Sequence, residues 1–408
     1  MICRHCKSAV SLNLIDLGSA PPSNAYLTSA QLGRSELYVP LRVFVCEECW
    51  LAQTEDFTSS EDIFDADYAY FSSYSSSWIS HCRSYLDAAV KRFDLGSGSF
   101  LLEVASNDGY LLDLVKDRGI PCAGVEPAIG AAKLATAKGL RIHNEFFGAQ
   151  LAAKLVKLGE SSDLVVANNV LAHVPDINDF VEGFRIILKP GGVASFEFPH
   201  LMKLLTETQF DTIYHEHFSY LSLSAVHRIF ECNGLSIFDV QEVSTHGGSL
   251  RVFAQLALSG QRPEQHSVRH ILKRESDFGI CSHGAYSAFQ TKAEKVKDDF
   301  LRFLIDSKRA GKTVAAYGAA AKGNTLLNYA GVRSDLISYV IDKNSRKQGK
   351  FLPGSRIPIM APDYLQARRP DYLIILPWNI AKEVREQNAW VAELGTQFVT
   401  AVPALRFF

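Results

Sequence analysis

Leu101-Leu102-Glu103-Val104-Ala105-Ser106-Asn107-Asp108-Gly109-Tyr110-Leu111-Leu112 is the stretch that decides the fold. Its first four residues are typical of a buried strand, the polar residues that follow predict a turn, and the apolar residues after Gly109 predict the start of a helix. A strand, a glycine-containing turn and a helix in this order predict an α/β sheet with a ligand site at the strand end. The turn is not G-x-G-x-x-G, because Ala105 and Asn107 occupy the glycine positions of that dinucleotide pattern.

The same alternation of strand and helix continues on the carboxyl side of this stretch. Strands are expected at residues 100–105, 122–126, 163–168, 193–198, 235–240 and 250–258, with helices between them, as at 131–138. This pattern predicts a parallel sheet, and the close spacing of the last two runs predicts an antiparallel pair at one edge. We therefore assign residues 79–285 to a central Rossmann-like domain.

A second α/β unit follows a charged amphipathic helix expected at 292–309. Its strands are expected at 313–317, 337–341, 372–376 and 398–402, which predicts a Rossmann-like domain over residues 286–408. Residues 1–78 form a third unit, with short strands, paired cysteines and an aromatic–serine stretch. The fold class is therefore α/β with a small N-terminal module.

The overall composition excludes several classes of protein. The chain has 408 residues, of which 47% are hydrophobic and 21% charged, and its formal net charge is −2. That balance gives no sign of a nucleic-acid surface, and no apolar run approaches the ~18 residues that cross a bilayer. Because the N-terminus lacks an apolar signal sequence, the cysteines are interpreted as reduced and the expected location is the cytoplasm. A monomer without membrane or nucleic-acid partners is expected.

Four cysteines predict a metal site near the N-terminus. They form two C-x-x-C pairs, Cys3 with Cys6 and Cys46 with Cys49. Each pair presents two thiolates from a tight turn, and two pairs complete a tetrahedral shell that suits zinc. Four thiolates leave no open coordination position, so the predicted role is structural.

The cofactor site is expected at three successive strand ends. The stretch quoted above is close to the E-x-x-x-x-x-G turn of class I S-adenosylmethionine methyltransferases. Glu126 ends the second strand, where an acid suits the ribose hydroxyls, and a polar pair ends the next strand over the same crevice. The candidate cofactor-binding residues are Glu103, Ser106, Asn107, Asp108, Gly109, Glu126, Asn168 and Asn169.

An unusual cluster of acid–base groups lies downstream, Tyr214-His215-Glu216-His217-Phe218-Ser219-Tyr220. Imidazoles, a carboxylate and phenols are the groups from which proton-transfer sites are built, and their burial needs polar partners. A catalytic metal is an alternative, but the spacing is not H-E-x-x-H. On a strand His215 and His217 would share a face, yet no clear third ligand is near in sequence.

Taken in order, these motifs closely resemble the nucleotide-sugar C-methyltransferases that make branched deoxysugars. The resemblance extends over essentially the whole chain. It includes the four cysteines, Asp67-Tyr68-x-Tyr70-x-Ser72-Ser73, Glu103 with Asn107-Asp108-Gly109, Asn169-x-x-x-His173, the 214–218 cluster, residues 317–324, Asp342-Lys343-Asn344 and Pro377-Trp378-Asn379.

This resemblance implies a reaction and a set of roles. The implied substrate is a thymidine-diphosphate (TDP) 4-keto deoxysugar, methylated at a carbon beside the ketone, with carbon 3 the expected position. The carbon must lose a proton to form an enolate, which requires a base of near-neutral pKa and donors for the enolate oxygen. His217 is the expected base, with Glu216, Tyr214, His173 and Tyr68 as the other catalytic candidates. His215 is interpreted as structural.

The C-terminal domain is implied to hold the nucleotide of the substrate. Lys322 supplies positive charge for a diphosphate, and Asp342 ends a strand in the acid position of a nucleotide fold. The candidate substrate-binding residues are Tyr70, Ser72, Ser73, Lys322, Asn324 and Asp342.

Two other functions are compatible with parts of the sequence. One is an epimerase or NAD-type oxidoreductase that uses the C-terminal domain, although no G-x-G-x-x-G precedes its helix. The other is a non-catalytic zinc-ribbon scaffold, for which a cluster of acid–base groups would have no use.

Overall fold

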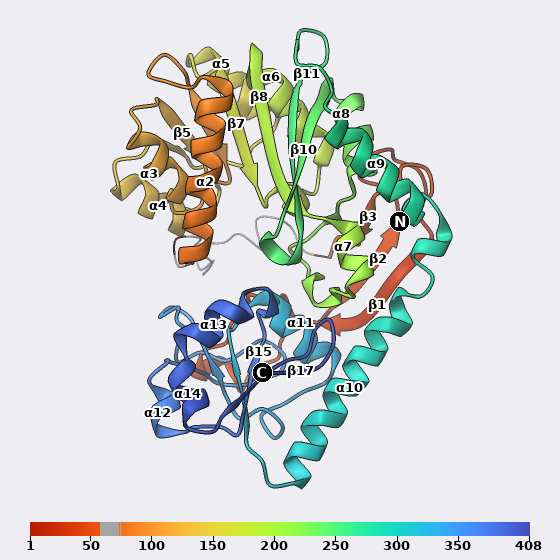
Figure 1. The fold of residues 1–408 in the computed structure, drawn as a ribbon, viewed down its shortest axis with the longest axis vertical. Coiled ribbons are helices and arrows are strands. Elements are labelled where there is room, and N and C mark those ends of the chain that lie inside the picture. The colour runs from red at the N-terminus through yellow and green to blue at the C-terminus, as the bar shows by residue number, and fades with distance from the viewer. Residues whose placement is uncertain (58–72, 74) are drawn as a thin grey trace.

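A computed structural model describes residues 1–57, 73 and 75–408. Figure 1 shows two α/β lobes, one above the other, with the N-terminal strands running along one side of both. The N-terminal module is an antiparallel sheet of order β1-β2-β3-β9. Its strands are β1 Leu12–Ala20, β2 Val39–Val45, β3 Ala52–Thr54 and β9 Ser219–Tyr220. The fourth strand therefore comes from the 214–220 cluster, which lies far away in the sequence.

The central lobe is the predicted α/β sheet, in the order β10-β11-β8-β7-β4-β5-β6. Its strands are β4 Leu101–Val104, β5 Cys122–Val125, β6 Ile142–His143, β7 Ser162–Asn168, β8 Leu188–Pro199, β10 Leu235–Val243 and β11 Ser249–Leu256. Strands β4 to β8 pair in parallel, and β10 and β11 form the expected antiparallel edge. The class of fold predicted from the sequence is confirmed.

Helices cover both faces of this sheet. They are α2 Ser76–Phe93, α3 Tyr110–Lys116, α4 Ile129–Ala137, α5 Ala149–Lys157, α6 Ile177–Ile187, α7 Leu201–Thr206, α8 Leu223–Cys232 and α9 His266–Phe278. Residues of α5, α6 and α8 share one apolar core with the sheet, and residues of α2, α3 and α4 share the other. Successive residues of a strand point to opposite faces of the sheet. Because helices cover both faces, the residues on both sides of each covered strand must be apolar.

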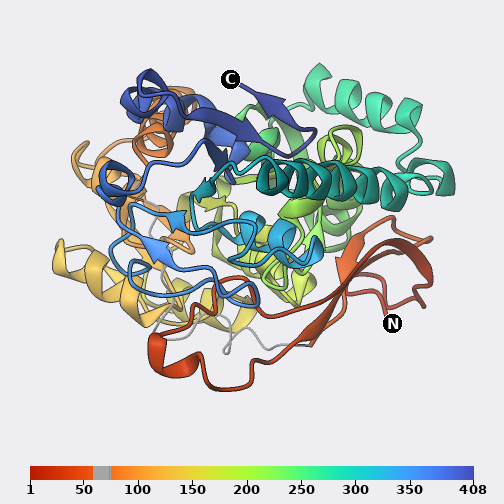
Figure 2. The same cartoon turned by 90° about the horizontal axis from the view of Figure 1, so that it is seen from below.

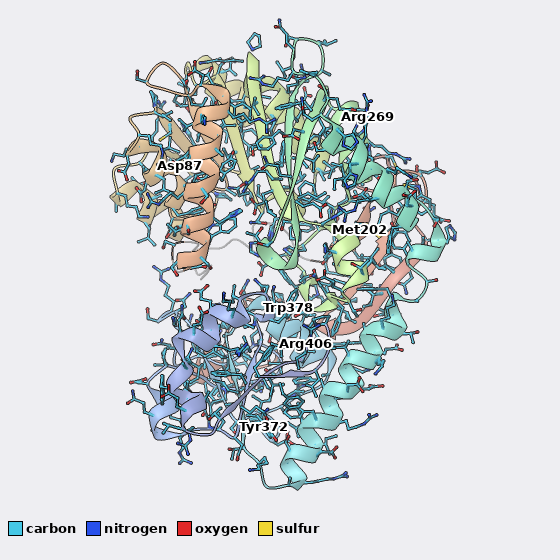
Figure 3. All side chains as sticks on the ribbon, in the orientation of Figure 1. Asp87, Met202, Arg269, Tyr372, Trp378 and Arg406 are labelled. Carbon is cyan, nitrogen blue, oxygen red and sulfur yellow. The ribbon has the colours of Figure 1, made fainter. Side chains whose placement is uncertain are left out.

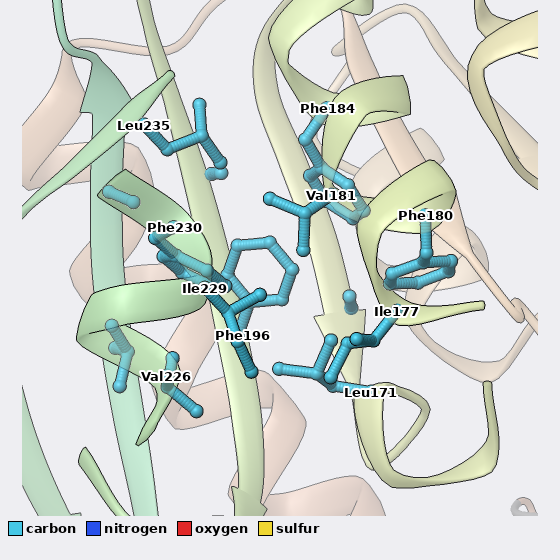
Figure 4. Packing of buried hydrophobic residues seen from close by; sticks show 14 of the residues in the cluster. Leu171, Ile177, Phe180, Val181, Phe184, Phe196, Val226, Ile229, Phe230 and Leu235 are labelled. Carbon is cyan, nitrogen blue, oxygen red and sulfur yellow. The ribbon is translucent and has the colours of Figure 1, made fainter. Parts of the chain in front are cut away.

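Aromatic side chains fill the core under α6 and α8. Phe196 of β8 lies between Phe184 of α6 and Phe230 of α8, with ring centroids 4.5 and 4.7 Å apart (Figure 4). Each of these rings is fully buried, which stabilises the fold by roughly 2–3 kcal/mol per side chain relative to exposure. The packing fixes the carboxyl ends of β7 and β8, from which the candidate site is built.

The C-terminal lobe is a second, mainly parallel sheet of order β14-β13-β12-β15-β16-β17. Its elements are α10 Phe289–Arg309, β12 Val314–Tyr317, α11 Ala321–Tyr329, β13 Val340–Ile341, β14 Ile359–Met360, α12 Tyr364–Ala367, β15 Tyr372–Ile375, α13 Ala381–Gln387, α14 Ala389–Glu393, β16 Gln397–Thr400 and β17 Arg406–Phe407. The strand order reverses between β12 and β15, and such switch points are where α/β sheets bind ligands at their carboxyl ends.

The N-terminal chain connects the two lobes. Residues of β1 and β2 share one apolar core with α7, α10 and α11. Beyond β1, Leu27 exchanges backbone hydrogen bonds with Phe351 of the C-terminal lobe. Figure 2 shows the N-terminal chain running along the lower edge of the molecule in that view. In the part of the chain that the structure describes, no helix has the length and apolar character needed to cross a bilayer.

Candidate active site

The four predicted zinc ligands come together in the N-terminal module. The sulfur atoms of Cys3, Cys6, Cys46 and Cys49 all lie within 4.8 Å of one another. Cys3 and Cys49, like Cys6 and Cys46, have their Sγ atoms 3.5 Å apart. A tetrahedral zinc with Zn–S bonds of ~2.3 Å sets its thiolates just under ~4 Å apart, so the cluster fits the metal.

The zinc module is joined directly to the 214–220 cluster. Strand β3 pairs with β9, and Thr54 binds this segment twice, through its amide to the Phe218 carbonyl (3.1 Å) and through Oγ1 to the His217 carbonyl (3.1 Å). Arg4, next to a zinc ligand, donates to the Phe218 carbonyl at 3.2 Å. The segment that carries His217 therefore continues into β9, the edge strand of the zinc-module sheet.

A cavity of about 160 Å³ lies at the carboxyl ends of β4, β5 and β7. Among the predicted cofactor residues, Asn107, Glu126, Asn168 and Asn169 line it, and so does His173. Glu103, Ser106, Asp108 and Gly109 do not line it: they form the buried strand end and turn behind it. Trp78 of α2 contributes an aromatic wall that sequence reasoning did not identify.

The polar groups of this cavity suit a nucleoside with a cationic amino-acid end. The Glu126 carboxylate accepts hydrogen bonds from the Asn107 and Ala128 amides, both at 2.8 Å. Burial raises the pKa of Glu126 to about 7 and that of Glu103 well above its ordinary value. Among the described residues, Asn168 Oδ1 is buried without a hydrogen-bond partner. Such an oxygen is costly to bury unless a ligand pairs with it, which fits a bound cofactor.

Two glycines permit the close approach of the chain segments around this turn. Gly109 has φ +78°, and a Cβ there would lie 2.3 Å from Leu140 Cδ1. A Cβ at Gly124 would lie 2.4 Å from Ser106 Oγ. Gly109 was predicted to bind the cofactor; in the structure it shapes the turn and does not line the cavity.

Next to the cavity, two imidazoles and a phenol pack together. The ring centroids of His173 and His217 are 4.6 Å apart, and those of Tyr214 and His217 are 4.0 Å apart. The His217 Nδ1 lies 3.0 Å from the Thr212 carbonyl, which can only accept. Nδ1 must therefore carry the proton in the neutral ring, and the lone pair is at Nε2.

Burial makes both imidazoles weak bases. It lowers the pKa of His173 to about 4, and burial together with the nearby His173 holds the pKa of His217 well below its usual range. The sequence analysis expected a near-neutral pKa for the base. The difference arises because the rings are removed from water and face other imidazoles, which disfavours the charged form. Both rings are neutral at pH 7.

Glu216 is held by a residue that the sequence analysis missed. Asn24, in the segment after β1, donates from Nδ2 to Glu216 Oε1 at 2.5 Å. Tyr26 donates to the Ala319 carbonyl of the C-terminal lobe at 2.6 Å. The N-terminal module thus reaches both the acid–base cluster and the loop after β12. His215 is buried elsewhere, with Nε2 3.2 Å from the Pro40 carbonyl.

The switch point of the C-terminal sheet faces the central lobe. Lys322 donates to Asn379 Oδ1 at 2.6 Å, and its Nζ lies 4.8 Å from the centroid of the Trp378 ring. Trp378 donates in turn to Asp211 at 2.8 Å. Figure 3 shows Trp378 at the end of this lobe nearest the central sheet. Burial lowers the pKa of Lys322, and a negatively charged ligand would stabilise its charged form here, as Asp211 does.

The remaining predicted substrate residues are placed differently. Asp342 accepts from the Ala319 and Asn344 amides at 2.7 and 2.8 Å and so fixes the loop after β12. Asn324 is buried at the start of α11. Ser73 is exposed beside α2. Tyr68, Tyr70 and Ser72 lie outside the described residues.

Comparison with known proteins identifies the family. Family models match residues 3–64 as a zinc binding domain, 78–240 as a methyltransferase domain and 244–403 as a C-methyltransferase C-terminal domain. The C-methyltransferase NovU of Streptomyces niveus is 35% identical over 404 residues, which cover 99% of this chain and 96% of NovU. The chain belongs to the C-methyltransferase family.

This C-methyltransferase is also similar to solved structures over part of its length. Magnesium protoporphyrin IX methyltransferase from Synechocystis matches with 17% identity, 43% of this chain and 78% of that chain, at a TM-score of 0.33. An S-adenosylmethionine-dependent methyltransferase from Clostridium acetobutylicum matches with 13% identity, 44% of this chain and 92% of that chain, at a TM-score of 0.36.

The family assignment and the site together establish the cofactors. The protein is an S-adenosylmethionine-dependent C-methyltransferase with a four-cysteine zinc site. This outcome favours methyl transfer over the oxidoreductase and scaffold alternatives. The roles of individual site residues and the domain limits at 78 and 285 remain predictions.

Proposed function

We propose that this C-methyltransferase methylates carbon 3 of a TDP-linked 4-keto deoxysugar. The observation that carries the proposal is the packed pair of neutral imidazoles beside the cofactor cavity, with the His217 lone pair at Nε2. Carbon becomes nucleophilic next to a ketone once it loses a proton, so a base beside a methyl donor fits a keto acceptor. The switch point of the C-terminal sheet supports a nucleotide-linked acceptor.

His217 is proposed to take the proton from carbon 3 at its Nε2. The electrons of that C–H bond form the C3–C4 double bond, and the carbonyl π pair moves to the oxygen. His173, Tyr214 and Tyr68 are the candidate donors to this enolate oxygen, where hydrogen bonds act most strongly on developing charge. Glu216, held by Asn24, is proposed to position the acceptor or its neighbouring groups.

The cofactor is proposed to be held by Glu126 at the ribose and by Asn107, Asn168 and Asn169 around the rest of the cavity. When bound there, S-adenosylmethionine supplies an electrophilic methyl group. Burial of this cavity by Trp78 and other apolar side chains limits the access of water to the donor and to the enolate.

Lys322 is proposed to bind the diphosphate of the acceptor, with Asn324, Ser72, Ser73 and Tyr70 as further contacts. The lowered pKa of Lys322 supports an anion at this position, since a diphosphate would stabilise its charged form. Asp342 is proposed to act indirectly, because its carboxylate holds the Ala319 amide.

The test uses a panel of TDP-linked keto-sugars with labelled S-adenosylmethionine. Methylation of a 4-keto deoxysugar, with loss of the carbon 3 proton, is expected, and no labelled sugar from the whole panel would refute the proposed substrate class. A His217→Asn variant should bind S-adenosylhomocysteine normally while losing roughly 10²–10⁴-fold in turnover, the usual contribution of a general base. It should also fail to exchange the carbon 3 proton with solvent.

A further inference from the structure

The connection between β10 and β11 is fixed at the junction of the two lobes. Thr245 Oγ1 donates to Glu197 Oε1 at 2.7 Å, and Gln209 Nε2 donates to the Gly247 carbonyl at 2.8 Å. A Cβ at Gly247 would lie 2.4 Å from the Trp378 ring of the C-terminal lobe. This turn, residues 244–248, is therefore in close contact with both lobes.

His246 at the centre of this turn has a backbone conformation that side chains disfavour. Its φ is +54° and its ψ is 21°, and the following Gly247 and Gly248 also have positive φ. A glycine would adopt this conformation without strain, whereas a histidine does not. A strained residue that is held firmly by its surroundings is a candidate for function.

The ring of His246 lies where the parts of the proposed site meet. It stands edge-on to Trp78, the aromatic wall of the cofactor cavity, with centroids 5.5 Å apart. A charge on His246 would lower the pKa of both His173 and His217, and Lys322 contributes to lowering that of His246 itself. The ring thus contacts Trp78 of the cofactor cavity and lies within electrostatic range of the base and of the lysine of the C-terminal lobe.

The state of the ring suits a ligand contact. His246 is half-buried, and burial lowers its pKa to about 4, so the imidazole is neutral and has one donor and one acceptor nitrogen. Neither nitrogen forms a hydrogen bond with any residue that the structure describes. The neighbouring Glu197 is already occupied by His81, Arg251 and Thr245.

We propose that His246 is a further acceptor-binding residue, whose imidazole hydrogen-bonds an oxygen of the sugar and holds the reacting carbon beside the cofactor cavity. The role deepens the proposed function and rests on it, since the ligand is the polyhydroxylated keto acceptor. It differs from the role of His217, because His246 exchanges no proton with the reacting carbon. A further imidazole would restrict which face of the acceptor meets the methyl donor.

Replacement by glycine separates this role from a structural one. The His246→Gly variant relieves the strained φ, so its melting temperature should equal or exceed that of the wild type. Loss of one ligand hydrogen bond should lower kcat/KM for the acceptor by about tenfold or more, while the affinity for S-adenosylhomocysteine stays unchanged. Free imidazole should restore part of the turnover, because the glycine leaves room for the missing ring.

Asp94 provides the matched control. It directly follows the last residue of α2, has φ +52° and is exposed, away from the site. Asp94→Gly should change the melting temperature in the same direction and leave acceptor kinetics as in the wild type. The two variants therefore share the backbone effect and differ only in the side chain that faces the acceptor.

Three results would overturn the role of His246. They are wild-type kcat/KM in His246→Gly, an equal loss of S-adenosylhomocysteine affinity, and a loss of activity explained by a lower melting temperature. These are distinct from failure of the proposed function, in which the wild type itself methylates no sugar of the panel. In that case a cell extract supplies the acceptor, and label transfer by the wild type and by the same variants is compared. Equal transfer by wild type and variant would refute the role.

Discussion

The contact between Asn24 and Glu216 gives a prediction with a calculable size. Asn24 Nδ2 donates to Glu216 Oε1 at 2.5 Å, and the Glu216 side chain is buried. Asn24→Asp puts a carboxylate where the amide was. Two unit charges ~4 Å apart in surroundings of effective dielectric constant ~20 repel by about 4 kcal/mol. One pKa unit corresponds to about 1.4 kcal/mol. The repulsion therefore raises the apparent pKa of the pair of carboxyl groups by about three units, to about 7.

The direction of the pH effect on activity follows from the proton that the two carboxyl groups share. Below pH 7 the pair keeps one proton, so the new carboxyl group still donates to Glu216 as the amide did. Above pH 7 both groups ionise and repel, and the segment that carries residue 24 should move away. Relative to the wild type, Asn24→Asp should therefore be nearly as active at pH 6 and lose activity progressively toward pH 9.

The stability of the Asn24→Asp variant should depend on the protonation of the same pair of carboxyl groups. The folded-state pKa of the new carboxyl group is raised above its unfolded value of about 3.9, so its contribution is fully present below pH 3.9 and is lost as the pH rises toward 7. The melting temperature of the variant should fall relative to the wild type across this window.

The assay is transfer of labelled methyl groups at pH 6 to 9, with melting temperatures measured from pH 4 to 8. Asn24→Leu is the control, since it removes the hydrogen bond without adding a charge and should lower activity by a factor that does not depend on pH. A constant ratio of Asn24→Asp to wild-type activity over this range would refute the reasoning, as would identical stability profiles.

Three further predictions concern the cofactor, the metal and the turn after β4. Because burial raises the pKa of Glu126 to about 7, S-adenosylhomocysteine affinity measured by calorimetry should fall up to about tenfold per pH unit below that value, and Glu126→Gln should abolish this dependence. Cys46→Ser should lower the zinc content measured by mass spectrometry and reduce methyl transfer more strongly than S-adenosylhomocysteine binding, since β3 of the module pairs with the strand after His217, whereas the module meets the cofactor cavity at its edge, where Arg4 donates to the Pro175 carbonyl. Gly109→Ala should lower the unfolding free energy by about 2–4 kcal/mol, from a left-handed φ and a steric clash, whereas Gly119→Ala, with φ +69° and open space around it, should cost only about 1–2 kcal/mol in denaturant titrations.

Local sequence predicted most of the regular structure, because strands and helices depend on short-range periodicity. The turn after β4, the antiparallel edge of β10 and β11 and the long helix α10 all follow from residues close in the chain. The prediction was less accurate where strands are short. Residues 337–341 were expected to form a strand, but only Val340 and Ile341 do, and the two-residue strands β6, β14 and β17 were missed. Two residues carry too little periodicity to be recognised.

The site residues divide in the same way. Glu126, Asn168 and Asn169 could be predicted because parallel strands end at a common edge. Asn24 and His246 could not, since their proposed roles depend on contacts between segments far apart in sequence. The run Thr245-His246-Gly247-Gly248 contains a hint, because two adjacent glycines mark a turn with unusual backbone angles.

The sequence by itself determined the α/β class, the four-cysteine zinc site and the methyltransferase chemistry, since these depend on residue type and spacing along the chain. Only the tertiary structure decided that β9 completes the zinc-module sheet, that Asn24 holds Glu216, and that the imidazoles of His173 and His217 are neutral. The physical reason is that hydrogen-bond partners and pKa values are set by burial and by neighbours in space. The turn quoted at the start predicts a methyl-donor site. The packing of the segments that carry Asn24, His217 and His246 determines which groups lie beside that site.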